Sequence, residues 1–198
     1  MMKFFGPFSI AALGALTATN SKAEKGCETY PPEATVYGSC DLAEAGEEPL
    51  WRGLPEGIEE VSRYAFIDGR GFFWVSVTVT QNTNGTANLR VVGTKRRTTI
   101  QTRPRKRREV SRELTPQEVA TLRKLAEDTG TFDFEIGSWD EADAIYLHCQ
   151  TLQMERANSN GYRFSSASIS CNRPAKLVPL VEEIARLAGL ELDGAIYH

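Results

Sequence analysis

Two cysteines and a histidine near the C-terminal end of the chain are the residues whose types could do chemistry. His148 directly precedes Cys149, and Cys171 follows on a second strand candidate. A cysteine nucleophile needs a free thiolate and a base within reach. Neighbouring residues of a strand point to opposite faces, so the backbone would separate His148 from Cys149. The sequence therefore favours a Cys149–Cys171 disulfide over a cysteine nucleophile.

The hairpin expected around these cysteines supports the same pairing. Strand candidates at 144–157 and 162–171 flank a turn that contains Gly161. A three-residue loop ending at Gly161 places the required left-handed conformation there and sets Cys149 opposite Cys171. Directly opposed Cα atoms lie about 4.5–5.5 Å apart, which is within the disulfide range. The same register predicts two further cross-strand pairs, Glu155 with Ser165 and Arg156 with Phe164.

The alternative chemistry is acid–base catalysis by His148 with a nearby carboxylate, either Asp143 or Glu155. It would make the protein a small hydrolase or transferase. The competing interpretation is a surface histidine on a hairpin that follows an acidic loop. The sequence contains no zinc-ligand spacing, Gly-rich phosphate loop, nucleophile elbow or His-Glu-x-x-His pattern. We therefore expect no metal ion and no cofactor.

The N-terminus is typical of an export signal. Lys3 precedes an apolar stretch from Phe4 to Ala18, and the small residues Ser21 and Ala23 suit cleavage after residue 23. The stretch falls short of the roughly 20 residues that span a bilayer as a helix. We therefore expect residues 1–23 to be a signal peptide and the mature protein to be periplasmic or secreted.

Residues 24–60 form an acidic, irregular segment in which several prolines interrupt the chain. Cys27 and Cys40 lie in it. An even number of cysteines in an exported chain favours disulfides because the compartment is oxidising, so we expect Cys27–Cys40 beside Cys149–Cys171. Four cysteines allow three connectivities, and a distant pairing is the alternative. A local disulfide would stabilise this segment, which has little apolar content of its own.

Strands are expected in the first half of residues 61–198. The stretch 72–80 alternates apolar and polar side chains like a half-buried strand, and the Asn84-Gly85 turn returns the chain into a second strand. A further pair of strands is expected on either side of Pro104. The expected strands are 63–67, 72–80, 87–92, 97–103 and 107–111.

Two helices with one apolar side complete the pattern. Thr115, Pro116 and Glu118 form a capping box that opens the first helix, and Gly130 ends it. The last helix runs from about residue 175 to 188, with Pro179 in its first turn. Strands followed by a helix, a hairpin and a helix indicate one α+β domain over 61–198. We expect an antiparallel sheet of several strands and hairpins, packed with two helices and held by two disulfides.

Four stretches follow one another along the mature chain: "LWRGLPEG", "LTPQEVATLRKLAE", "DAIYLHCQTLQME" and "GYRFSSASISCNRP". This layout resembles that of small exported proteobacterial proteins of uncharacterised function. There, an acidic loop leads into a strand with Glu, then Gly-x-Tyr, then a strand that ends near Arg and Pro. The matching residues here are Asp143, Glu155, Gly161, Tyr162, Arg173 and Pro174. The resemblance implies this order of elements and no activity.

Residues 95–112 are the most basic part of the chain, with nine basic residues and one acid. Charge runs are usually solvated, and here they can protect a sheet edge from pairing with another chain. The alternative interpretation is an anion-binding face. Its candidate residues are Lys95, Arg96, Arg97, Arg103, Arg105, Lys106, Arg107 and Arg108.

These features predict a non-catalytic exported envelope protein that binds an anionic partner through a basic hairpin. An exported protein rarely meets nucleic acid. The expected partners are therefore lipid headgroups, lipopolysaccharide or an acidic protein, with peripheral membrane contact as one mode. The hydrolase or transferase that uses His148 is the second hypothesis. An inhibitor of an envelope enzyme is the third.

Overall fold

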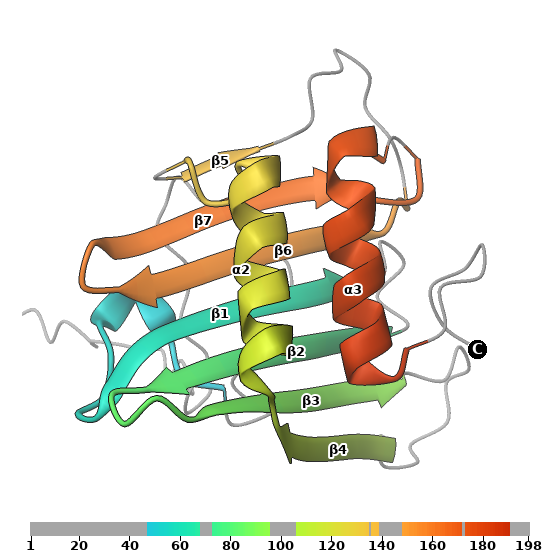
Figure 1. The fold of residues 1–198 in the computed structure, drawn as a ribbon. Helices are drawn as coiled ribbons and strands as arrows, with labels where there is room; N and C mark the ends of the chain where they lie inside the picture. The colour runs from blue at the N-terminus through green and yellow to red at the C-terminus, as the bar shows by residue number, and fades with distance from the viewer. Residues whose placement is uncertain are drawn as a thin grey trace, which may run out of the picture.

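The described part of the chain is one layered α+β structure. A computed structural model describes residues 47–67, 73–95, 106–134, 136–138, 148–171 and 173–190. These residues form a seven-stranded sheet in the order β4-β3-β2-β1-β6-β7-β5, and two α-helices cross one of its faces (Figure 1). The strands are β1 (Ile58–Ile67), β2 (Phe73–Asn82), β3 (Ala87–Lys95), β4 (Lys106–Glu113), β5 (Ile136–Ser138), β6 (Thr151–Asn158) and β7 (Gly161–Ser168). The expected α+β fold is confirmed: six strands pair antiparallel, and the short β5 runs parallel to β7.

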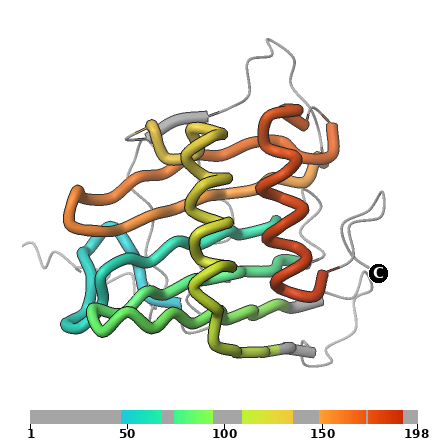
Figure 2. Tube along the Cα trace, in the orientation of Figure 1, coloured from blue at the N-terminus to red at the C-terminus, as the bar shows by residue number. Residues whose placement is uncertain are grey.

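The sheet is built from two chain segments that meet at β1. Strands β1 to β4 form a meander, in which each strand pairs with the next along the chain. The β6–β7 hairpin comes later and adds to the other side of β1, as the trace in Figure 2 shows. The central strand therefore joins partners that are close in sequence to partners that are distant.

The main core lies between the sheet and the two helices, α2 (Pro116–Thr129) and α3 (Val178–Ala188). Alternate residues of each strand point to this face because side chains alternate along a strand. The buried strand residues of this core include Tyr64, Phe66, Val77, Leu89, Leu152 and Met154. The helices contribute Leu122 and Ala126 from α2 and Leu180, Val181, Ile184 and Leu187 from α3.

Both helices begin and end where the sequence predicts. Thr115 Oγ1 accepts a hydrogen bond from the Glu118 backbone N–H, and the Glu118 carboxylate accepts one from the Thr115 N–H in return. Gly130, at φ 70°, ends α2 in the left-handed conformation that favours glycine. A 3-10 turn, η2 (Ala175–Leu177), leads into α3, and Pro179 falls in the first turn of the helix, where it costs no hydrogen bond.

The opposite face of the sheet is buried as well, so the prediction that β2 is half-buried is wrong. Trp74 and Ser76, which point away from the helices, are 3% and 0% exposed. Part of this face is covered by the chain before β1, which forms the 3-10 turn η1 (Leu50–Arg52). Leu50 packs against this face, and the Trp51 ring meets the Tyr162 ring edge-on at 6.2 Å between centroids.

The bounds of several strands differ from the prediction: β6 begins at Thr151, within the expected strand 144–157, and β7 ends at Ser168 rather than at residue 171. β1 begins at Ile58 rather than at residue 63. β4 pairs with β3, and the predicted pairing of β4 with residues 97–103 falls outside the described residues. β3 continues to Lys95, and its ladder with the basic strand β4 sets Val91 directly opposite Val110.

The Cys149–Cys171 disulfide is confirmed, with 5.7 Å between the Cα atoms. The hairpin register that was used to predict it is wrong by one residue. Asn158 pairs with Gly161, so the loop holds only two residues. Gly161 does have a left-handed backbone, at φ 99°, but as the first residue of β7.

The register shift changes the cross-strand partners of the hairpin. Glu155 lies opposite Phe164, not Ser165, and Arg156 lies opposite Arg163, not Phe164. The cysteines misled the alignment because both lie beyond the strand ends, where the ladder no longer dictates which residues meet. The correct bond was therefore predicted from an incorrect strand alignment.

The disulfide indicates folding in an oxidising compartment, because cytosolic thiols are normally kept reduced. The described residues contain one disulfide and no free cysteine. Cys27 and Cys40, with the expected signal peptide, lie outside them. No described helix has the length and apolar character needed to cross a bilayer.

Candidate functional site

The basic run is placed on the edge of the sheet. β4 is the outermost strand next to β3, so one side of its backbone has no neighbouring strand among the described residues. Lys106, Arg107 and Arg108 begin this edge strand, and Lys95 is directly opposite Lys106 at the end of β3. The other four candidates, Arg96, Arg97, Arg103 and Arg105, lie outside the described residues. The strand register thus places four cationic residues at one corner of the sheet.

Charge is distributed unevenly along β4. Residues of like charge that oppose each other directly destabilise a ladder, and Lys95 with Lys106 is such a pair. Further along, cations and anions alternate: Arg90 Nε donates to Glu109 Oε1 at 3.0 Å, and Arg112 Nη2 lies 2.9 Å from Glu118 Oε1. The positive charge is therefore concentrated at the beginning of β4.

The residues of the acid–base alternative are not assembled into one site. His148 is exposed, has a left-handed backbone (φ 64°), and lies just before the disulfide. Glu155 is buried in the middle of β6. At about 3.3 Å per residue, the strand from Thr151 to Glu155 alone spans about 13 Å. Asp143 lies outside the described residues.

Glu155 instead belongs to a buried ion network on the sheet face that carries η1. Arg63 Nη1 donates to Glu155 Oε2 at 3.2 Å, and the Tyr162 hydroxyl donates to Glu155 Oε1 at 2.9 Å. Arg63 and Glu155 are cross-strand partners on β1 and β6, and their side chains are 3% and 1% exposed. A buried carboxylate is tolerated only when paired and hydrogen-bonded, and both oxygens of Glu155 meet this condition.

The network continues into the segment before β1. Arg63 Nη2 lies 3.3 Å from Glu47 Oε2 and donates to the Glu48 carbonyl oxygen at 2.7 Å. Glu47 also pairs with Arg90 through Oε1 and accepts a hydrogen bond from Thr78 Oγ1. These contacts tie residues 47 and 48 to three strands. We interpret the network as the means by which this segment is held on the sheet.

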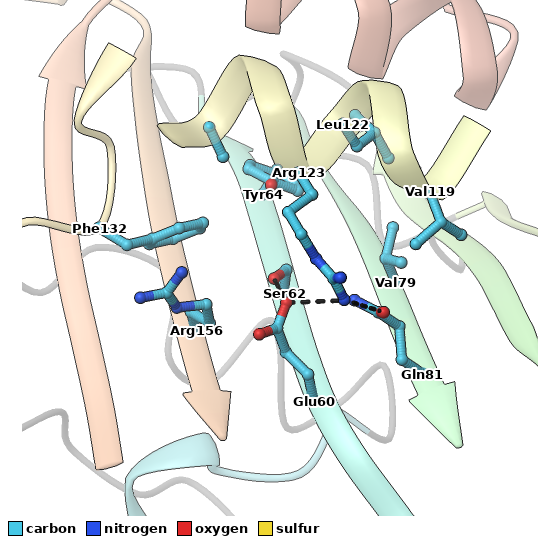
Figure 3. Close-up of a pocket in the computed structure, with 11 residues that line it drawn as sticks. Glu60, Ser62, Tyr64, Val79, Gln81, Val119, Leu122, Arg123, Phe132 and Arg156 are labelled. Atoms are coloured by element: carbon cyan, nitrogen blue, oxygen red, sulfur yellow. Dashed lines mark hydrogen bonds between the residues drawn. The ribbon is translucent and has the colours of Figure 1, made fainter. Parts of the chain in front are cut away.

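A small polar cleft lies on the other face, between α2 and the sheet (Figure 3). It encloses about 20 Å³. One end is formed by Arg156, whose guanidinium lies 4.8 Å from the centroid of the Phe132 ring. At the other end Arg123 Nη2, from α2, donates to Gln81 Oε1 at 2.7 Å, and Gln81 Nε2 donates to Glu60 Oε1 at 3.1 Å.

Tyr64 supplies a neutral hydroxyl to this cleft. Burial raises the pKa of Tyr64 strongly, and the nearby Glu60 carboxylate raises it further; Arg156 and a hydrogen bond from Ser62 oppose these effects less strongly. The phenol therefore stays protonated throughout the physiological range. It is available as a hydrogen-bond donor, and it contributes no charge.

Sequence reasoning missed both the ion network and the cleft. Arg63 was visible as a charge beside the apolar run Tyr64–Ile67, and such a charge must find a buried partner if the strand is central. Its partner Glu155 was considered only as a catalytic carboxylate. Arg156 and Arg163 meet only in the register with a two-residue loop, so the predicted register concealed them.

Comparison of the chain with known protein families, with curated protein sequences and with solved structures found no match.

Proposed function

We propose that this protein is a non-catalytic, exported, disulfide-bonded binding domain of the cell envelope. It binds a phosphate-bearing anionic surface, of lipid headgroups or lipopolysaccharide, through the basic corner formed by Lys95, Lys106, Arg107 and Arg108. The observation that carries the proposal is the placement of these residues at the beginning of the edge strand β4, with two lysines directly opposed.

Electrostatics favour a surface over a deep pocket for this corner. The four cationic residues lie at a corner of the sheet edge, and each Lys or Arg held near an anionic membrane contributes about 1 kcal/mol. Binding by four such residues is weak enough to be reversible and is screened by salt. The same charges also keep β4 from pairing with another chain. The basic corner would therefore serve both solubility and binding.

An oxidised periplasmic or secreted location supports this choice of partner. The Cys149–Cys171 disulfide is typical of exported proteins, and the N-terminus is typical of a signal peptide. Phosphate groups of lipids and lipopolysaccharide are the abundant anions in that location, whereas nucleic acid is rare there.

The test is co-sedimentation of the oxidised mature protein with vesicles. Vesicles rich in phosphatidylglycerol are compared with phosphatidylcholine vesicles and with lipopolysaccharide, each at low and high salt. We expect binding to the anionic surfaces at low salt only. The variant Lys106→Glu/Arg107→Glu should lose it.

The matched control reverses one lysine and one arginine elsewhere, in Lys124→Glu/Arg186→Glu. Their side chains are 73% and 60% exposed, and each takes part only in a local surface ion pair. This control changes net charge equally and should still bind. Equal loss in both variants would show that net charge, not the basic corner, is responsible. If the protein captured an acidic protein and bound no vesicles, the partner would be that protein and not a lipid or lipopolysaccharide surface.

A further inference from the structure

The strands β6 and β7 bring together two arginines that no carboxylate neutralises among the described residues. Arg156 and Arg163 are direct cross-strand partners, and neither has an ion-pair partner there. Directly opposed residues have Cβ atoms about 4.5–5.5 Å apart, and like charges at this spacing repel. The arginines of the buried ion network differ in this respect, because Arg63 and Arg90 each form ion pairs with carboxylates.

Arg156 carries a second unusual feature. Its Nε atom is buried and has no hydrogen-bond acceptor among the described residues. A buried donor without an acceptor costs about 1–3 kcal/mol. The Phe132 ring holds the guanidinium in place from one side, as Figure 3 shows, so the group is fixed in position. A fixed guanidinium with unused donors is the arrangement that recognises carboxylates and phosphates.

The cleft described above adjoins this arginine pair. Its enclosed space of about 20 Å³ exceeds the roughly 10–15 Å³ that one water needs, so it admits a single oxygen-sized atom. Ser62 lies directly opposite Arg156 on β1 and adds a hydroxyl, and the neutral Tyr64 hydroxyl also lines the space. The lining thus offers the Arg156 guanidinium and the Tyr64 hydroxyl as donors around room for one oxygen.

Glu60 is the one acidic residue that lines the cleft. Its carboxylate is already occupied, because Oε1 accepts from Gln81 and Ser62 and Oε2 accepts from Asn158. These hydrogen bonds disperse its charge and hold it at the end of the cleft away from Phe132, as Figure 3 shows. The carboxylate of Glu60 thus accepts hydrogen bonds from three neighbouring side chains.

We propose that Arg156 and Arg163 form a binding site for a small oxyanion, a carboxylate or phosphate group. One of its oxygens enters the cleft beside Ser62 and Tyr64, and the remainder of the ligand stays outside. This site is at the β6–β7 turn end of the sheet, whereas the basic corner is at the opposite end of the strands. The two sites are independent, and each is tested by its own variants.

The experiment is calorimetric titration of the oxidised mature protein with sodium phosphate and, separately, with sodium acetate. Sodium chloride keeps the ionic strength constant. We expect one of these anions to bind in preference to chloride. The anion that binds more tightly identifies the anionic group of the ligand as a phosphate or a carboxylate. Arg156→Gln and Arg163→Gln should each weaken binding at least about tenfold, because a charge-assisted hydrogen bond is lost.

Arg186→Gln is the matched control, since it removes an exposed arginine of α3 that does not line the cleft. It should bind like the unmodified protein. Arg163→Gln should also be at least as stable as the unmodified protein in chloride, because it relieves the repulsion, yet lose the stabilisation that the anion provides.

The proposal is overturned if neither anion binds above chloride, or if Arg156→Gln and Arg163→Gln bind as tightly as Arg186→Gln. A marked loss of stability in Arg163→Gln without anion would also contradict it, because the arginine would then have a structural partner.

Discussion

The buried ion pair between Arg63 and Glu155 can be tested by replacing Glu155 with glutamine. The amide has nearly the shape of the carboxylate, so packing on β6 is retained while the charge is removed. Glu155 accepts hydrogen bonds from Arg63 and from the Tyr162 hydroxyl, and both donors are held in place by the sheet. The substitution therefore reports the charge rather than the volume.

The expected cost follows from what Arg63 retains. Removing one partner of a fully buried pair costs about 3–5 kcal/mol, because an uncompensated charge is left behind. Here Arg63 keeps Glu47 at 3.3 Å and the Glu48 carbonyl at 2.7 Å, so the cost should fall below that range. Losing a charge-assisted hydrogen bond alone costs about 1.5–3 kcal/mol. We expect Glu155→Gln to destabilise the protein by about 2 kcal/mol.

The assay is urea unfolding of the oxidised protein at neutral pH, followed by tryptophan fluorescence. Asp128→Asn is the control, because it makes the same chemical change in an exposed ion pair with Lys124 and should cost less than about 0.5 kcal/mol. The double variant Arg63→Met/Glu155→Met should be more stable than Arg63→Met alone, since apolar replacement of both partners leaves no charge on β6 unpaired. A loss for Glu155→Gln no larger than for Asp128→Asn would refute the reasoning.

Two further predictions concern the Cys149–Cys171 disulfide and the helix-capping residue Glu118. Cys149→Ser/Cys171→Ser opens a loop whose ends are 22 residues apart, and the chain-entropy estimate gives a loss of about 3 kcal/mol, measurable as a lower urea midpoint than that of the oxidised unmodified protein; an unchanged midpoint would contradict it. Hydrogen bonds from Arg112 and Thr115 lower the pKa of Glu118 from 4.5 to about 2. Because the unfolded state takes up this proton first, stability is full above about pH 4.5 and declines as the pH falls toward 2. Glu118→Gln should flatten the dependence of Tm on pH in that window and leave it unchanged above it; equal slopes for both proteins would dismiss the effect.

Local patterns in the sequence were sufficient for most elements. The capping box at Thr115, the glycine after each helix and the alternation along β2 depend on short-range physics, and the corresponding elements appear where they were expected. The Asn84-Gly85 turn likewise connects β2 to β3, with Gly85 at φ 85°. These features need no knowledge of distant partners.

The pairing and register of strands could not be predicted from such local patterns. β3 and β4 are separated by residues 96–105, so no two-residue turn signal in the sequence predicted their pairing. The hairpin register was judged from two cysteines outside the ladder, so the Arg156–Arg163 pair was hidden. Burial of the second face was missed because Ser76 and Thr78 are polar, although a covering segment can satisfy them.

The position of β1 between near and distant partners has a consequence for the order of folding. One side of β1 can pair with β2 as soon as both strands are synthesised. The other side pairs with β6, which comes much later in the chain, since Arg63 and Glu155 are 92 residues apart. Such non-local pairing slows folding, and an open strand edge can meanwhile recruit another chain. Arg63 lies in the middle of the edge of β1 that stays unpaired until β6 is added. Its charge disfavours contact with any strand that lacks a carboxylate at the matching position, and a slip of one residue in β6 would turn Glu155 to the other face of the sheet. The ion pair that holds the finished sheet therefore also selects the strand that completes it.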